Sequence, residues 1–138
     1  PRGNNTNSDV IYLRYADVLL MYAEALNELN SGPNTEAYNA INLVRERARY
    51  NGNVVQNILP DLSALSYNEF RTAVLNERRH ELVMEGSRYN DLVRFGVLVE
   101  TVQASGKANV NPQDFHHLLP IPQRERDMNS KLTQNTGY

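Results

Sequence analysis

Residues 12–30 have the sequence YLRYADVLLMYAEALNELN. Apolar residues recur in this stretch at steps of three and four, the spacing that puts side chains on one face of an α-helix. Leu13, Leu20 and Met21 widen the apolar face and leave a narrow polar strip of Arg14, Asp17, Glu24 and Glu28. The sequence predicts a helix from Val10 to about Leu29 that is covered on more than one side. The main apolar face consists of Tyr12, Tyr15, Ala16, Leu19, Ala23, Leu26 and Leu29.

A turn and a second helix follow directly. Gly32 favours the end of a helix and Pro33 blocks its continuation, while Asn34 or Thr35 can cap the next helix. Because the loop is short, the two helices are predicted to form an antiparallel αα-hairpin. The hairpin loosely matches one tetratricopeptide repeat, a unit that needs neighbours to bury its faces. The second apolar stripe is Ala37, Ala40, Ile41, Val44 and Ala48.

Two more helices are predicted further along the chain. A turn at Asn51–Asn53 and a connector over residues 54–65 precede Ser66-Tyr67-Asn68-Glu69, which has the spacing of a capping box. The third helix is predicted from Tyr67 to about Glu85. Gly86 interrupts it, Ser87 can cap again, and a fourth helix is predicted from Arg88 to about Phe95.

The remaining residues, from Lys107 onward, predict ordered coil with one short helical turn after Pro122. Leu118, Leu119 and Ile121 are its expected anchors to the core. Together these segments predict an all-α fold: a tetratricopeptide-like helical array of about four main helices with a long ordered-coil C-terminal tail. We expect residues 1–138 to form a single domain.

The composition excludes several classes of function. The net charge of −2 with 14 scattered Lys and Arg residues gives no basic surface for nucleic acid, so none is expected as a partner. The absence of cysteine excludes disulfides, thiol catalysis and a Cys-based zinc site. No apolar run approaches the roughly 20 residues of a membrane span. The chain begins at Pro1 without a signal sequence, so we expect targeting information to lie upstream.

The densest charge cluster is ERRHE at residues 77–81, followed by Glu85 and Arg88. Glu77 and His80 have the Glu-x-x-His spacing of helical di-metal sites, but those sites need a second such motif, which the sequence lacks. Glu77, Glu81 and Glu85 lie side by side on one helical face, whereas the two carboxyls of a glycosidase flank the scissile bond. We therefore predict an ion-pair network that fixes how the third and fourth helices meet.

The other candidates also favour structural roles. His116 and His117 are predicted as surface or packing residues, and no Gly-rich phosphate loop or nucleophile motif is present in the sequence. We predict no catalytic, cofactor-binding or metal-binding residue and no cofactor. Tyr12, Tyr15, Tyr22 and Tyr38 are predicted as core residues, while Tyr50, Tyr67 and Tyr138, if exposed, can stack on a sugar ring.

Four motifs resemble the SusD/RagB family in the same order and spacing. Residues 12–25, YLRYADVLLMYAEA, resemble its central helix signature, and residues 77–94, ERRHELVMEGSRYNDLVR, resemble its most distinctive stretch. The segment from Ala40 to Ala48 is similar to the helix that follows the signature. Leu119-Pro120-Ile121-Pro122, then Asn129 and Gln134-Asn135-x-Gly137-Tyr138, are similar to the family's C-terminal ending.

This resemblance implies a function and a location. Such proteins are non-catalytic lipoproteins of the outer membrane, exposed on the cell surface. They bind an oligosaccharide or other nutrient and cap a TonB-dependent, SusC-like transporter. The resemblance places this chain in the C-terminal region, with the lipid anchor and further helix pairs upstream. Residues that contact ligand in the family lie largely outside these motifs, so the ligand-binding residues remain unknown.

Two alternatives stay open. A tetratricopeptide-like scaffold that binds a peptide or protein partner is the first. A helical hydrolase or metalloprotein that uses the region from Glu77 to Glu85 is the second. For residues 1–138 taken alone, the apolar first helix predicts an open apolar patch and self-association.

Overall fold

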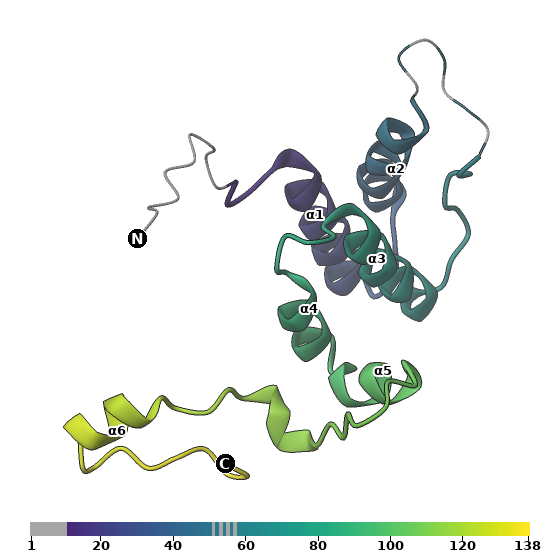
Figure 1. Ribbon diagram of the computed structural model, residues 1–138. Coiled ribbons are helices and arrows are strands. Elements are labelled where there is room, and N and C mark those ends of the chain that lie inside the picture. Colours follow the sequence, from purple (N-terminus) through teal and green to yellow (C-terminus); the bar gives the residue numbers. More distant parts are fainter. Residues whose placement is uncertain (1–10, 51, 53, 55, 57) are drawn as a thin grey trace. The chain divides into compact units, whose positions relative to one another are not determined.

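The computed structural model describes residues 11–138 apart from 51, 53, 55 and 57. The described residues form α-helices and one short 3-10 helix, with no β-strand among them (Figure 1), which confirms the predicted all-α class. The elements are α1 (Tyr15–Asn30), α2 (Thr35–Arg49), α3 (Tyr67–Glu81), α4 (Arg88–Phe95), α5 (Leu98–Ala104), η1 (Asp114–His117) and α6 (Gln123–Met128).

The chain divides into two compact units. Unit 1, Pro1–Glu85, contains α1, α2 and α3, and unit 2, Gly86–Tyr138, contains the remaining elements. The single domain over residues 1–138 stays a prediction.

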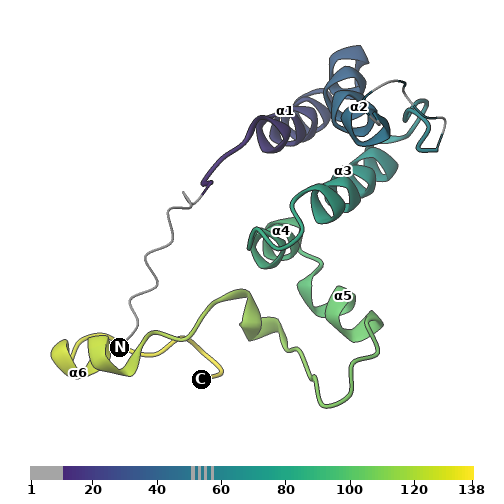
Figure 2. The ribbon, with the colours of Figure 1, turned by 45° about the horizontal axis from the view of Figure 1, so that its top comes forward.

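Three helices lie side by side in unit 1 (Figures 1 and 2). The hairpin of α1 and α2 is as predicted, and α3 packs against it. Alanines at the contacts allow close approach of the helices, and Phe70 fills the centre with its ring edge against Tyr38, at 5.1 Å between centroids. The core consists of Leu20, Ala23, Ala37, Ala40, Ile41, Val44, Phe70 and Val74.

The first helix begins later than predicted. The predicted start, Val10, lies outside the described residues. In the structure α1 begins at Tyr15. Arg14 is extended at the N-cap, with φ −132° and ψ 159°, and its carbonyl accepts from the N–H groups of Asp17 and Val18. The Arg14 side chain meanwhile binds the end of α3. A distant partner therefore sets this boundary.

The turn between α1 and α2 differs in one detail. The residue in the left-handed conformation is Ser31, at φ 54°, and not Gly32. The N–H groups of both residues donate to the carbonyl of Asn27, which satisfies the end of α1. Asn34 caps α2 by accepting from the Ala37 N–H at 2.9 Å, as predicted.

The connector that follows α2 is held by side chains of that helix. The described part of residues 54–65 is not helical, as predicted, while the predicted turn residues Asn51 and Asn53 lie outside the described residues. Asn42 bonds both the N–H and the carbonyl of Leu62, at 2.8 and 3.0 Å. Tyr38 likewise bonds both the N–H and the carbonyl of Leu65. Arg45 and Arg49 donate to the carbonyls of Pro60 and Leu59.

The third helix starts at its predicted cap but ends earlier than predicted. The capping box of Ser66 and Glu69 is present. The helix ends at Glu81 and not at Glu85, and Met84 takes a left-handed conformation at φ 67°. The carbonyl of Glu81 accepts from the guanidinium of Arg14. This bond gives a C-terminal carbonyl of α3 its partner and marks the end of the helix.

The capping box gives a testable contribution to stability. We expect Ser66→Ala to lower the free energy of unfolding by about 1 kcal/mol, because the first turn of α3 loses an acceptor for its N–H groups. Urea titration of the chain measures this loss. Ser63→Ala in the exposed connector makes the same chemical change without a cap and is the matched control. An equal loss in both variants would contradict the capping role.

The same box predicts a pH dependence. Hydrogen bonds from the side chain and backbone of Ser66 lower the pKa of Glu69 below its ordinary value. Because the folded-state pKa is depressed, this stabilisation is present above the ordinary pKa and is lost as the pH falls through the folded value. We expect the difference in free energy of unfolding between the chain and Ser66→Ala to become smaller as the pH falls. Urea titrations at stepwise lower pH measure this difference.

Unit 2 contains α4, which has the predicted bounds, and α5, which the sequence did not predict. Gly96 separates them in a left-handed conformation at φ 73°. Ser87 occupies the N-cap position of α4 without a side-chain capping bond. The short helical turn predicted after Pro122 is present as α6.

Side chains of residues 134–138 form hydrogen bonds with the backbone of the segment before α6. Gln134 bonds both the N–H and the carbonyl of Ile121, at 2.8 and 3.0 Å. Asn135 and Tyr138 donate to the carbonyls of Leu119 and Leu118. The side chains of Leu118 and Leu119 are exposed, so the prediction that they anchor the tail is wrong for these two residues in this structure. Hydrogen bonds to their backbone hold the segment.

Candidate functional site

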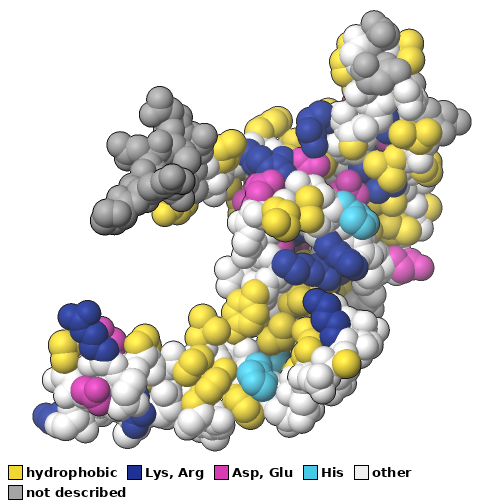
Figure 3. Space-filling model, in the orientation of Figure 1, with side chains coloured by type: hydrophobic (Ala, Val, Ile, Leu, Met, Phe, Trp, Pro, Cys, Tyr) yellow, Lys and Arg dark blue, Asp and Glu magenta, His cyan; other side chains and the backbone are white. Residues whose placement is uncertain are grey.

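The carboxylates of Glu77, Glu81 and Glu85 lie at the C-terminal end of α3 and in the turn that follows it. They are the residues for which the sequence raised catalysis as a hypothesis. In unit 1, acidic and basic side chains lie next to one another over this region, with apolar side chains between them (Figure 3). The partners of each carboxylate decide what the cluster can do.

Glu77 pairs with Arg45 of α2. Their side chains are 10% and 11% exposed, and Arg45 Nη1 donates to Glu77 Oε2 at 2.7 Å. The remaining donors of Arg45 are not idle, because Nε and Nη2 both donate to the carbonyl of Pro60. The pair is therefore buried and geometrically fixed on α2 and α3.

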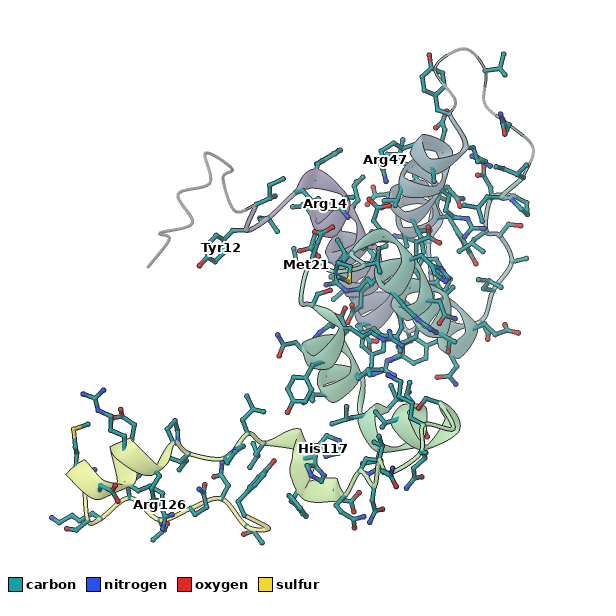
Figure 4. The ribbon with its side chains drawn as sticks, in the orientation of Figure 1. Tyr12, Arg14, Met21, Arg47, His117 and Arg126 are labelled. Carbon is teal, nitrogen blue, oxygen red and sulfur yellow. The ribbon has the colours of Figure 1, made fainter. Side chains whose placement is uncertain are left out.

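Two arginines hold Glu81. Arg47 Nη2 donates to both of its carboxylate oxygens, at 2.7 and 2.6 Å, and Arg14 donates to Oε1. Arg14 also forms a forked contact with Glu85, with Nε at 3.0 Å and Nη2 at 2.8 Å from Oε1. The hydrogen bonds that Arg14 donates to Glu85 have the largest effect on its pKa, and those to Glu81 the next largest. Both raise the pKa of Arg14 above its ordinary value. Figure 4 labels Arg14 at the start of α1 and Arg47 on α2.

A further buried pair joins α1 to α3. Arg78 Nη1 donates to Asp17 Oδ1 at 2.6 Å, and the side chains are 6% and 22% exposed. Every helix of unit 1 therefore contributes to a group of ion pairs, which we call together the ion-pair network. Its members are Arg14, Asp17, Arg45, Arg47, Glu77, Arg78, Glu81 and Glu85.

The predicted ion pairs are present, and the described partners of the α3 carboxylates lie on α2 and at the start of α1. That these charges fix how the third and fourth helices meet stays a prediction. In unit 2, Arg94 donates to Asp91 three positions earlier on α4, at 3.1 Å. The pairing of Arg45 and Arg47 with α3 was not predicted from the sequence, because it joins residues more than 30 positions apart.

This geometry favours a structural role for the carboxylates. Glu77 and Glu81 are nearly buried, and their oxygens face guanidinium groups on neighbouring helices. A glycosidase instead holds two carboxyls on opposite sides of an accessible bond. Glu77 Oε2 accepts from Arg45, and within the described residues no group of three or more His, Asp or Glu side chains is arranged to hold a metal ion.

A hollow of about 580 Å³ lies beside this network in unit 1, between α2, the connector and α3. Ala48, Leu59, Leu62 and Ala73 form its apolar lining, and Asn76 and His80 contribute polar groups. The sequence did not predict this hollow, because its walls come from three separate segments. Nothing about its residues assigns them to a ligand.

The two neighbouring histidines make local contacts in unit 2. The ring of His116 packs against Phe115 at 4.2 Å between centroids, and its Nδ1 lies 2.8 Å from the N–H of Gln113. His117 Nδ1 lies 2.6 Å from the carbonyl of Asp114. These contacts support the predicted packing role.

The tyrosines differ in their surroundings. Tyr38 packs on the core as predicted, but Tyr12, Tyr15 and Tyr22 are 96%, 72% and 47% exposed, so their prediction as core residues is wrong for this structure. Tyr12 precedes α1 and extends away from the helices of unit 1 (Figure 4). Tyr67 donates to Glu28, and this hydrogen bond raises the pKa of the phenol.

Comparison with known proteins places this arrangement in a family. The chain matches the SusD family along residues 1–138. It belongs to the SusD family. A SusD-like protein of Formosa agariphila is 38% identical to the chain and matches all of it, and another from the same organism is 36% identical over 99% of it.

Solved structures show the same SusD fold. The crystal structure of a SusD homolog from Bacteroides thetaiotaomicron has 40% sequence identity and a TM-score of 0.79 over 98% of the chain. A SusD superfamily protein from Bacteroides vulgatus has 30% identity and a TM-score of 0.70 over 91% of the chain. The chain spans about a quarter of the length of the SusD-like proteins it matches, 26% and 27%, and 30% of the first structure.

Proposed function

We propose that this chain is the helical scaffold of a SusD-family surface protein that binds a glycan or other nutrient without turning it over. The match to the SusD family along residues 1–138 carries the proposal. The chain spans about a quarter of its relatives, so the proposal assigns nutrient binding to the full-length protein and takes this chain as its C-terminal region.

The ion-pair network supports the non-catalytic part of the proposal. The carboxylates that a hydrolase would need are engaged by arginines and hold helices together. The full-length protein then delivers its nutrient to a TonB-dependent, SusC-like transporter in the outer membrane. A lipid anchor upstream of this chain attaches it to the cell surface. Among the described helices, none has the length and apolarity to cross a membrane.

Calorimetry of the full-length protein against a panel of oligosaccharides tests this proposal. We expect at least one glycan to bind and to be recovered unchanged after prolonged incubation with the protein. Glu81→Gln serves as the matched variant, because it keeps the shape of the side chain while removing the charge. Absence of binding across the panel would contradict a glycan ligand. Shorter products that disappear in Glu81→Gln would instead identify a hydrolase.

The α1–α2 hairpin favours one alternative, a tetratricopeptide-like scaffold that binds a peptide or protein partner. The two functions differ in the ligand, which is a glycan or other nutrient in the first and a peptide or protein partner in the second. A full-length protein that binds no glycan but retains a protein partner through unit 1 would support the alternative.

A further inference from the structure

A hollow of about 410 Å³ lies in unit 2 beside η1. One wall is η1 together with the residue that follows it, and the other is formed by residues 133–136. The volume lies within the range of about 300–1,000 Å³ that small-ligand sites occupy. We call this space the η1 hollow. The lining side chains that determine its chemistry are Asp114, Phe115, His117, Leu118, Thr133 and Thr136.

Contacts within unit 2 already fix both walls of the η1 hollow. Gln134 bonds the N–H and the carbonyl of Ile121, which fixes the wall formed by residues 133–136. The backbone of Gly137 lies so close to Phe115 that a Cβ at position 137 would come within 2.3 Å of the ring. Because these contacts are present without a ligand, binding in the hollow orders few additional groups.

Several polar groups of the hollow are left available by these contacts. The hydroxyls of Thr133 and Thr136 and the carboxylate of Asp114 form no hydrogen bond with another described residue. The Nδ1 of His117, labelled in Figure 4, lies 2.6 Å from the carbonyl of Asp114. A carbonyl only accepts, so Nδ1 carries the proton and Nε2 remains an acceptor. The hollow therefore offers two hydroxyls, which donate and accept, together with a carboxylate and an imidazole nitrogen, which accept.

These groups suit the hydroxyls of a sugar. Each sugar hydroxyl donates one hydrogen bond and accepts others, as the groups of the hollow require. Leu118, which is 59% exposed, and the edge of Phe115 supply apolar surface for the C–H groups of a sugar ring. Asp114 is the only Asp, Glu, Lys or Arg among the described residues that line the hollow. A carboxylate without a cationic neighbour disfavours a second negative charge.

We propose that the η1 hollow binds one neutral sugar residue of a glycan. This inference rests on the proposed function, in which the full-length protein binds a glycan or other nutrient. It adds a location within unit 2 and a preference for uncharged sugars over uronic acids or sulfated sugars.

Methyl NMR of the full-length protein, labelled at the threonine methyl groups, tests the site directly. Thr133 and Thr136 place two methyl groups at the hollow, and Thr72, exposed on α3, is the internal control. Thr133→Val and Thr136→Val each remove one threonine signal and so assign it. The neutral probes are the methyl glycosides of glucose, galactose and mannose, and glucuronate is the anionic probe.

We expect at least one neutral glycoside to shift the Thr133 and Thr136 signals saturably without changing the Thr72 signal. Glucuronate should shift neither of the two. Asp114→Asn should weaken the binding of the neutral glycoside by about tenfold or more, because a hydrogen bond to a charged group is lost. Asp127→Asn, on the exposed surface of α6, makes the same chemical change outside the hollow and should leave the affinity unchanged.

Unchanged Thr133 and Thr136 signals with every neutral glycoside would overturn the inference, and so would equal shifts with glucuronate. An equal loss of affinity in Asp114→Asn and Asp127→Asn would also contradict it. A glycan that binds in calorimetry while both methyl signals stay unchanged rules out this site and leaves the proposed function standing. The two failures are therefore distinguishable.

Discussion

Asp17→Asn is expected to lower the free energy of unfolding of the chain by about 3 kcal/mol, near the lower end of the range for breaking a buried ion pair. Arg78 is 6% exposed, so the substitution leaves a guanidinium in a place where water cannot replace the lost carboxylate. Asp17 itself is 22% exposed, which is why the lower end of the range applies. Urea titration should show a lower midpoint with an unchanged slope.

A double-mutant cycle sharpens this prediction. Replacing both members with Asp17→Asn and Arg78→Met should recover part of the loss, since an apolar side chain of similar length needs no counter-charge. Glu46→Gln on the exposed surface of α2 is the matched control for removing one negative charge, and we expect a change within about 0.5 kcal/mol. A loss in Asp17→Asn no larger than in this control would show that the pair contributes little to stability.

Phe70→Ala should cost about 3–5 kcal/mol, because it removes a fully buried ring and leaves a cavity that the helices can only partly close. The ring fills the space where α1, α2 and α3 meet, and Tyr38 packs edge-on against it. Thermal and urea unfolding of unit 1 should both shift.

Tyr15→Ala is the matched control, since it removes a ring of similar size from an exposed position. We expect it to change the free energy of unfolding of the chain by much less than Phe70→Ala does. Equal losses for Phe70→Ala and Tyr15→Ala in the chain would argue against the observed core.

Local sequence signals predicted part of the fold correctly. The starts of α2 and α3 follow from Asn34 and Ser66, caps whose partners lie within three residues. The start of α1 and the end of α3 were misplaced by several residues for a shared reason. Both boundaries depend on Arg14 reaching residues about 70 positions away, and no periodicity records such a contact.

The candidate site shows the same division. The sequence identified the acidic and basic residues of α3 and predicted that they form ion pairs, but it did not indicate that Arg14, Arg45 and Arg47 supply partners. Asn27 gives a second example, since it is fully buried in α1 and its side chain donates to the carbonyl of Tyr67. An asparagine at a core position breaks the apolar pattern, and only the fold shows its partner.

The side chains of α2 that grip the connector have an evolutionary consequence. Asn42, Arg45 and Arg49 donate to the backbone carbonyls of Leu62, Pro60 and Leu59. Any residue that replaces one of these three keeps a backbone carbonyl at that position. The connector can therefore diverge in its side chains while keeping its path along α2. Proline is the exception at positions 62 and 65, where the backbone N–H is a donor. Family members should accordingly vary most in this segment and avoid proline at these two sites.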